Sequence, residues 1–527
     1  MRKFFNSKNT STSAPIYTQK LPDARENLPL SKSLSHNLNV LYELFSNCAD
    51  VVYHKFVIDS IERSCVLVFV NGLSDIKSIN ESIIPSIMNI KEISQDNLKS
   101  NGSIEIIKKH FLQVAEMNEI STIGEITNAL LNGNTILLLD GDDIALEITT
   151  PGWKEKNVSE TNVEKVMRGP NEGFTQNIAI NISQLRRKIK SSELKVEDFI
   201  VGKQTQTKIS IIYLHGIVDT SIVEEVKKRL SKINIDSVLE SGYIEELIED
   251  THFTLFPQIQ HSERPDRVAA GILEGRVALL VDGTPCVLIL PATLIQFLQT
   301  SEDYYERYST TLFIRSIRLI FFVISLLLPG CFVAIISYHK EMIPTPLLIS
   351  IIGAAHGVPF PIFIEALLME IAFEALREAG IRLPSPANQT VGIVGALVIG
   401  DAAVRAGVTS PIMVIIIATT AIASFSIPSY DMGYAIRILR FSMLCLGAFL
   451  GLYGIMLGII VLLIHLSSLK SFGVNYLSPL APLNLKELKD VLIRFPWTHM
   501  KCRPHFANIN NLHRQKSSSK NSKDKKG

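Results

Sequence analysis

Cysteine is scarce in this chain, and its spacing excludes the roles that cysteine most often signals. The six cysteines among 527 residues are scattered: Cys48, Cys65, Cys286, Cys331, Cys445 and Cys502. They form no CxxC pair, and no histidines lie near them at the spacing of metal ligands. Each is expected to be an inert thiol, so the sequence predicts neither a disulfide framework nor a bound metal.

The sequence also lacks the signatures of an enzyme or of a nucleic-acid-binding protein. Its soluble part contains no phosphate loop, no dinucleotide-binding fingerprint and no Ser-His-Asp or Cys-His arrangement. The net charge of +1 gives no basic footprint for nucleic acid. We therefore expect no catalytic residues, no cofactor, no nucleic-acid partner and no enzymatic activity.

Long uncharged runs are confined to the C-terminal part of the chain. Residues 319–338, LIFFVISLLLPGCFVAIISY, contain no charged side chain and are long enough, at about 1.5 Å per residue, to cross a hydrocarbon core of about 30 Å. The N-terminal MRKFFNSKNTSTSAP is basic but has no apolar core of a secretory signal. The region that precedes the apolar part, through Arg307, is therefore expected to be soluble and cytoplasmic.

This soluble region contains an internal repeat. The matching segments are FVNGLSD (69–75) with YLHGIVD (213–219), and EITNALLNGNTILLLDG (125–141) with RVAAGILEGRVALLVDG (267–283). In both longer segments an Asp-Gly pair, at Asp140 and at Asp282, closes an apolar run as a hairpin turn would. The repeat predicts two related α/β units with these aspartates at equivalent hairpins.

The predicted fold is multi-domain: two tandem α/β subdomains followed by an α-helical, multi-spanning membrane domain. The expected ranges are an N-terminal tail (1–50), α/β subdomain 1 (51–150), a linker (151–200), α/β subdomain 2 (201–307), the membrane domain (308–482) and a basic tail (483–527). The tail ends HRQKSSSKNSKDKKG, and the positive-inside rule places it in the cytoplasm. Both ends of the chain are therefore expected on the same side.

Five apolar segments make up the predicted membrane domain: residues 319–338, 346–373, 391–404, 408–428 and 441–466. Two cytoplasmic ends require an even number of crossings, so one of the five is expected not to span. The third is the best candidate because it is short, rich in glycine and contains Asp401, which suits a re-entrant or half-helical element. A turned-back second segment, interrupted by glycine and proline at 357–361, is the alternative.

Charged residues within these segments are the functional clue. A charge at the bilayer centre costs about 2.5 to 3.5 kcal/mol, so Glu365, Glu370 and Asp401 are expected to face a bundle interior, a partner subunit or a water-filled path. Helical spacing puts Glu370 and Glu374 on one face and Glu365 opposite. Repeated around a ring of identical subunits, the Glu370 face would present rings of carboxylates that attract cations.

The alternative is that these charges neutralise each other within the chain. At helical spacing Glu374 could pair with Arg377 and Asp401 with Arg405. His356, next to the helix-breaking Gly357, could act as a titratable element or simply pack. The pore or gating candidates are thus Glu365, Glu370, Glu374, Asp401, Arg405 and His356.

Several long blocks resemble the A subunit of GerA-type (GerABKA family) spore germinant receptors. They are ERPDRVAAGILEGRVALLVDGTPCVLILP (263–291), SEDYYER (301–307), GVPFPIFIEALLMEIAFEALREAGIRLP (357–384), VGALVIGDAAVRAG (394–407), IASFSIP (422–428) and SFGVNYLSPLAP (471–482). The resemblance runs in order from about residue 51 to 504. Two departures are Ala355-His356, where the family pattern has an Arg-Glu pair, and Asn171, where it has an arginine.

The resemblance implies a multi-pass subunit of a receptor in the inner membrane of bacterial endospores, with a transporter-like B subunit and a lipoprotein C subunit as partners. It further implies that A subunits form a homo-oligomer that acts as a nutrient-gated ion channel and so triggers germination, with recognition of the nutrient mainly by the B subunit. A non-conducting scaffold or transporter-like component of the same complex is the second hypothesis. The acidic residues of the membrane segments favour the channel.

Overall fold

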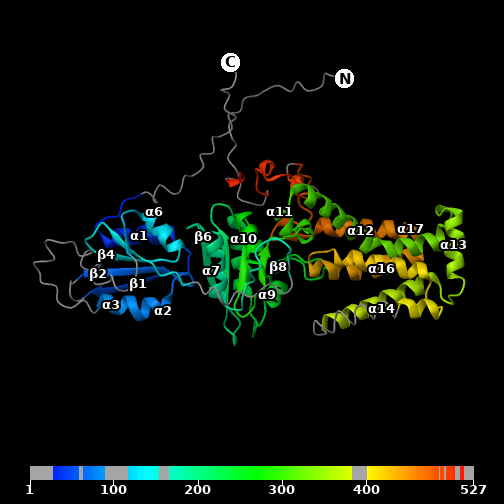
Figure 1. Ribbon diagram of the computed structural model, residues 1–527, viewed down its shortest axis with the longest axis horizontal. Coiled ribbons are helices and arrows are strands. Elements are labelled where there is room, and N and C mark those ends of the chain that lie inside the picture. Colours follow the sequence, from blue (N-terminus) through cyan, green and yellow to red (C-terminus); the bar gives the residue numbers. More distant parts are fainter. Residues whose placement is uncertain are drawn as a thin grey trace, which may run out of the picture.

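The computed structural model describes residues 28–58, 63–88, 117–152, 164, 166–382, 400–485, 487–491, 494–504 and 511–514. Figure 1 shows three bodies in a row: a first α/β unit in blue and cyan, a second in green, and a bundle of long helices. The second unit lies in the middle and contacts both neighbours.

The first unit is an antiparallel sheet covered by helices on both faces. Its strands are β1 (Val51–Ile58), β2 (Arg63–Val70), β3 (Met117–Ile120), β4 (Thr135–Leu139) and β5 (Ala145–Ile148), in the order β1-β2-β4-β5-β3. One face packs against α1 (Leu34–Leu44) and α6 (Ile123–Leu131). The other face packs against a π-helical turn (Ile79–Ile83) and α3 (Ile84–Met88), which follow the short α2 (Ile76–Ser78).

The second unit repeats this plan. Its strands are β6 (Leu194–Val201), β7 (Thr207–Leu214), β8 (Gln260–Ser262), β9 (Val277–Val281) and β10 (Val287–Leu290), in the order β6-β7-β9-β10-β8. Helices α7 (Ile178–Lys188) and α10 (Pro265–Leu273) cover one face. Helices α8 (Thr220–Lys232) and α9 (Ser241–Ile248) cover the other.

The predicted repeat is confirmed at its hairpins. Asp140 accepts a hydrogen bond from the backbone N–H of Leu34 at 3.1 Å, and Asp282 accepts one from the N–H of Ile178 at 3.2 Å. In each unit the aspartate therefore bonds to the first residue of the covering helix, α1 or α7. The two aspartates occupy equivalent turns and perform the same structural task.

Both units begin earlier than the ranges expected from sequence. Helix α1 lies within residues 1–50, expected as a tail, yet its leucines are part of the first core. Helix α7 and strand β6 lie within residues 151–200, expected as a linker, yet they belong to the second unit. The expected ranges leave these elements out because the repeated sequence segments begin after the first helix and the first strand of each unit.

A buried ion pair joins the two units. Arg186 of α7 binds Asp50, just before β1, through Nε at 2.7 Å and Nη2 at 2.8 Å, and both side chains are almost fully buried. Beside this pair, the backbone of Asn47 and Ala49 bonds to Val196 of β6. A bidentate guanidinium–carboxylate contact fixes orientation as well as distance, so the second unit docks on the first in one geometry.

The helical domain contains α12 (Tyr308–Tyr338), α13 (Thr345–Ala355), α14 (Ile362–Arg382), α16 (Pro411–Phe425) and α17 (Tyr430–Ser468). A short α11 (Glu302–Tyr305) precedes it. The break at 357–361 separates α13 from α14, and Pro361 directly precedes the first residue of α14, as the sequence predicts. Among the described residues, two helices, α12 and α17, are by length and composition long and apolar enough to cross a membrane.

Helix α17 is two antiparallel arms rather than one continuous rod. It reverses at Gly451, whose φ of +62° lies in the left-handed region. Beyond the turn, Gly454 lies against Leu446, and Gly458 lies against Met443. A straight helix would hold the two residues of each pair well apart. The fifth apolar segment, expected as a single span, therefore runs out and back.

The third apolar segment falls mostly outside the described residues, so its expected half-helical form is not described. Residues 400–405, at its end, are helical. After α17 the chain returns to the second unit, where β11 (Lys470–Ser471) and β12 (Val474–Asn475) pair with each other and Ser471 accepts from the backbone N–H of Ala292 at 3.0 Å. These residues, expected within the membrane domain, pack on the α/β unit.

Close packing of α12 on α17 depends on glycine. A Cβ added at Gly447 would lie 2.5 Å from the carbonyl oxygen of Gly330, a backbone atom that can move only with its helix. Gly447→Ala should therefore push the helices apart and cost about 1 to 3 kcal/mol, as overpacking does. The thermal unfolding midpoint of the purified chain in detergent should fall. Gly433→Ala in the same helix meets no atom within 4 Å, so it should leave the midpoint unchanged or raise it slightly, because alanine favours a helix more than glycine does.

Candidate functional site

Two glutamates of α14 are held by two arginines of α17. Glu370 pairs with Arg440 at 3.0 Å, and both side chains are 3% exposed. One turn along, Glu374 pairs with Arg437. Arg440 also donates from Nε to the carbonyl oxygen of Ser325 in α12 at 2.6 Å, so this contact joins three helices. The spacing that puts the two glutamates on one face of α14 is matched by arginines three residues apart on α17.

Glu365 lies elsewhere and caps another helix. Its carboxylate accepts from the backbone N–H of Ser410 at 2.7 Å and from the hydroxyl of Thr409 at 3.0 Å. Ser410 is the N-cap of α16, where unpaired N–H groups and the helix dipole favour a negative charge. The expectation that Glu365 and Glu370 do not share a face is thus confirmed, and Glu365 anchors the start of α16.

The remaining candidates are more exposed. Asp401 and Arg405 form an ion pair at 2.8 Å, which is the alternative that helical spacing allowed, with side chains 54% and 80% exposed. His356 follows α13 and is also exposed. Arg377, expected as the partner of Glu374, instead lies over the ring of Phe425 at 4.7 Å. The pairing of Glu374 with Arg377 is therefore corrected: the tertiary fold brings Arg437 to this carboxylate instead.

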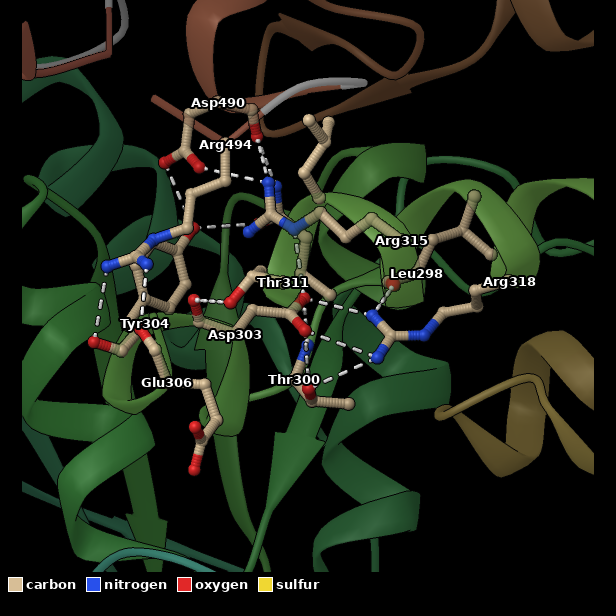
Figure 2. A network of polar contacts seen from close by, with 12 residues as sticks. Leu298, Thr300, Asp303, Tyr304, Glu306, Thr311, Arg315, Arg318, Asp490 and Arg494 are labelled. Atoms are coloured by element: carbon tan, nitrogen blue, oxygen red, sulfur yellow. Dashed lines mark hydrogen bonds and ion pairs between the residues drawn. The ribbon is translucent and has the colours of Figure 1, made fainter. Parts of the chain in front are cut away.

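A second polar network lies where the α/β region meets α12 (Figure 2). Asp303 of α11 binds Arg315 Nε at 3.0 Å and Arg318 Nη1 at 2.9 Å, and these arginines are one turn apart in α12. Arg318 also donates to the carbonyl oxygen of Leu298 at 2.8 Å. Burial alone would raise the pKa of Asp303, but the hydrogen bond and charge of Arg318, with the charge of Arg315, hold it below its ordinary value.

The C-terminal segment closes this network from the other side. Asp490 accepts from Arg315 Nη1 at 3.1 Å and from the Tyr304 hydroxyl at 2.9 Å. Arg494 donates to the carbonyl oxygen of Glu306 at 2.9 Å, and Figure 2 shows it beside Tyr304. Burial raises the pKa of Asp490, and Arg315 opposes that shift. We call Asp303, Tyr304, Arg315, Arg318, Asp490 and Arg494 the junction cluster.

A third contact joins the α/β region to the start of α17. His261 of β8 lies 3.0 Å from Asp431 in the first turn of α17. The hydrogen bond to Asp431 raises the pKa of His261 to about 9. Burial raises the pKa of Glu245 on α9, and the charge of Asp431 adds to that shift. The beginnings of α12 and α17 are thus both bound to the second α/β unit by charge.

The polar contacts link the second α/β unit to the helical domain at two places. The junction cluster and the His261–Asp431 pair connect the second α/β unit to helices that contact the α14 glutamates. Within the described ranges, no group of three or more His, Cys, Asp or Glu side chains could hold a metal ion. Arg437 and Arg440 are not among the residues singled out from the sequence, although their three-residue spacing resembles that of Glu370 and Glu374. The junction cluster had no such signal, because Asp490 and Arg494 lie far along the sequence from its other members.

Comparison with known proteins gives consistent matches along most of the chain. The family described as "Bacillus/Clostridium GerA spore germination protein" matches residues 39–506. Spore germination protein KA of Bacillus subtilis (strain 168) is 43% identical over 92% of this chain and 89% of its own length. Spore germination protein GerLA of Bacillus cereus is 39% identical over 84% and 89%.

A solved structure also matches the α/β region. It is the crystal structure of the N-terminal domain of the A subunit of the Bacillus megaterium spore germinant receptor GerK3. It is 33% identical, covers 52% of this chain and 100% of its own, and has a TM-score of 0.41.

The Glu370–Arg440 pair should be strongly coupled energetically. Arg440→Met leaves the Glu370 carboxylate buried without its partner and should cost about 3 to 5 kcal/mol of unfolding free energy, whereas adding Glu370→Gln should recover much of that loss. A double-mutant cycle of unfolding in detergent measures the coupling. Arg382→Gln, which breaks an exposed pair with Glu378, is the matched control and should cost less than about 0.5 kcal/mol. Additive losses at Glu370 and Arg440 would contradict the pairing.

The His261–Asp431 contact should weaken with rising pH. The folded-state pKa of His261 is raised above its ordinary value of 6.5, so the contact contributes fully below about pH 6.5 and is lost as pH rises through about 9. The difference in thermal midpoint between the wild type and Asp431→Asn should therefore shrink between pH 7 and pH 9 and level off above. A difference that stays constant over this range would show that His261 is not charged in the contact.

Proposed function

Because the chain belongs to the GerA family of spore germination proteins, which includes A subunits of germinant receptors, we propose that it is the subunit that conducts ions when the receptor is triggered. In this proposal it forms a homo-oligomer in the inner membrane of the spore and opens a cation path in response to a nutrient. A transporter-like B subunit and a lipoprotein C subunit complete the receptor. The chain itself is not an enzyme, since its sequence contains no catalytic constellation.

Exposed tyrosines at both ends of the helices support placement in a membrane. Tyr308, Tyr430 and Tyr434 stand at the ends of α12 and α17 that face the α/β units, and are 45–54% exposed. Tyr338 and Tyr453 stand at the opposite ends and are 53% and 65% exposed. Tyrosine favours the boundary between hydrocarbon and water, so two such levels are typical of a spanning bundle.

The reversal of α17 supports a multi-pass layout with both ends in the cytoplasm. Helix α12 leads away from the α/β units, α14 and α16 run back toward them, and the two arms of α17 run out and back (Figure 1). Because the second arm returns, the residues that follow α17 lie on the same side of the bundle as the α/β units. The expected odd count of five segments arose because the fifth was taken as one span.

The buried carboxylates of α14 are the observation on which cation conduction depends. Acidic groups inside an apolar bundle are costly and mark ion pathways in many membrane proteins. Glu370 and Glu374 are neutralised by α17 in the structure, which fits a closed state. Opening would then require α14 to move relative to α17, and the junction cluster offers a route by which the α/β units bias that movement.

A non-conducting role has its own supporting observation. Glu365, Glu370 and Glu374 all have partners within the same chain, so the described residues offer no uncompensated carboxylate on α14's inner face. If the pairs persist whenever the receptor is triggered, the chain is a scaffold that transmits a signal to a transporter-like partner.

Ion flux distinguishes these roles. The receptor complex reconstituted in liposomes should release a trapped monovalent cation on addition of nutrient. Glu370→Gln leaves Arg440 buried without its partner, so the release is compared per assembled complex, and it should still fall. Glu378→Gln, which changes an exposed glutamate of the same helix, is the control and should release the cation normally. Nutrient-triggered germination without any flux through the reconstituted complex would favour the scaffold. An unchanged release per assembled complex in Glu370→Gln would assign that residue a structural role.

A further inference from the structure

A loop of the second α/β unit runs beside the end of α17. Residues 251–257 follow α9, and the hydroxyl of Thr254 lies 2.9 Å from Nε2 of His465, close to the end of the second arm. The ring of Phe256 lies 6.2 Å from that of His465 and belongs to a core that includes Leu466 and Leu469. The loop is therefore fixed at the level where the apolar bundle meets the α/β unit.

Two apolar side chains of this loop are left uncovered. Thr254 and Phe256 contact the helix, and the residues that alternate with them, Phe253 and Leu255, are 99% and 44% exposed. Because Phe256 is buried and these two side chains are exposed, Phe253 and Leu255 face away from the core. Exposed phenylalanine costs free energy in water, and full exposure in an otherwise anchored loop indicates a covering partner.

The exposed apolar surface continues from the loop onto α17. Ile464, next to His465, is 63% exposed, and Leu463 is 52% exposed. Tyr434, at the corresponding level of the first arm, is 45% exposed. Exposed apolar side chains of the second arm therefore lie close to the loop that carries Phe253, because Ile464 adjoins His465, which contacts Thr254.

The charges around the loop suit a membrane surface. The carboxylate of Asp250 pairs with Arg229 at 2.6 Å, and that of Glu249 lies 3.4 Å from His252. The Asp250 carboxylate is therefore compensated by a guanidinium group. Lys470 is exposed just after α17 and can reach lipid phosphate.

We propose that Phe253 and Leu255 insert into the boundary between headgroups and acyl chains of the membrane leaflet that faces the α/β units, and thereby tether the second unit to phospholipid. The inference rests on the proposed membrane placement of α17. We assign Phe253 and Leu255 to lipid because their loop lies beside the end of α17, at the level of the tyrosines of that helix. The tether would restrain α9, and Glu245 of α9 faces the His261–Asp431 contact. This restraint would act independently of the covalent link through α12.

Depth-dependent quenching tests this tether in the full chain. The two native tryptophans are replaced by Trp153→Phe and Trp497→Phe, and a single reporter is introduced by Phe253→Trp in lipid nanodiscs. Val461→Trp, at a site 65% exposed in the second arm of α17, reports whether that arm is in the membrane. Ile200→Trp, at a site 72% exposed on the strand nearest the first unit, reports a water-facing position.

Lipids with a nitroxide near the headgroup should quench the Phe253→Trp emission, and dissolved iodide should quench it little. Iodide alone should quench Ile200→Trp, and lipids with a nitroxide deep in the acyl chain should quench Val461→Trp. Two outcomes for the Phe253→Trp reporter would overturn the tether, provided that lipid quenches Val461→Trp. One is quenching by iodide. The other is quenching by neither agent, as expected if Phe253 lies at a contact between subunits. An unquenched Val461→Trp would instead show that the membrane placement of α17, and with it the tether, is wrong.

Discussion

Burying charge among apolar helices constrains most of this structure. An ion taken out of water loses several kcal/mol of hydration unless another charge or a set of hydrogen-bond donors compensates it. Glu370 meets Arg440, Glu374 meets Arg437, and Glu365 meets the N-terminus of α16. These contacts fix where α14 lies relative to α16 and α17, because moving any one helix would leave a buried charge without a partner.

The same rule shapes the connection between the α/β units and the bundle. Arg315 and Arg318 begin α12 and are buried, so they require the carboxylates of Asp303 and Asp490. Asp490 comes from the far C-terminal segment, which means that the end of the chain helps to hold the beginning of the first long helix. The Asp50–Arg186 pair extends this rigid connection to the first unit. A displacement of either α/β unit would therefore be transmitted to α12 through ion pairs rather than through a flexible linker.

Glycine supplies the complementary constraint where backbones must approach closely. The reversal at Gly451 lets one apolar segment make two antiparallel arms, and Gly330 and Gly447 let α12 contact the first arm backbone to backbone. Close approach of this kind increases the van der Waals contact that holds helices together where hydrophobic burial gives little advantage. The ion pairs select which helices are neighbours, and the glycines decide how close they come.

Sequence alone predicts the division into an α/β region and an apolar helical region, the repeat with Asp140 and Asp282 at equivalent hairpins, the break before α14 and the family. These features depend on local patterns: hydrophobic runs, turn residues and repeated spacing. Tertiary structure alone decided that α1 and α7 belong to the units, that the fifth apolar segment reverses, and that Glu374 binds Arg437 rather than Arg377. Helical spacing specifies which side chains share a face, but not which helix arrives opposite them. That choice follows from packing the whole chain so that no charge stays buried alone.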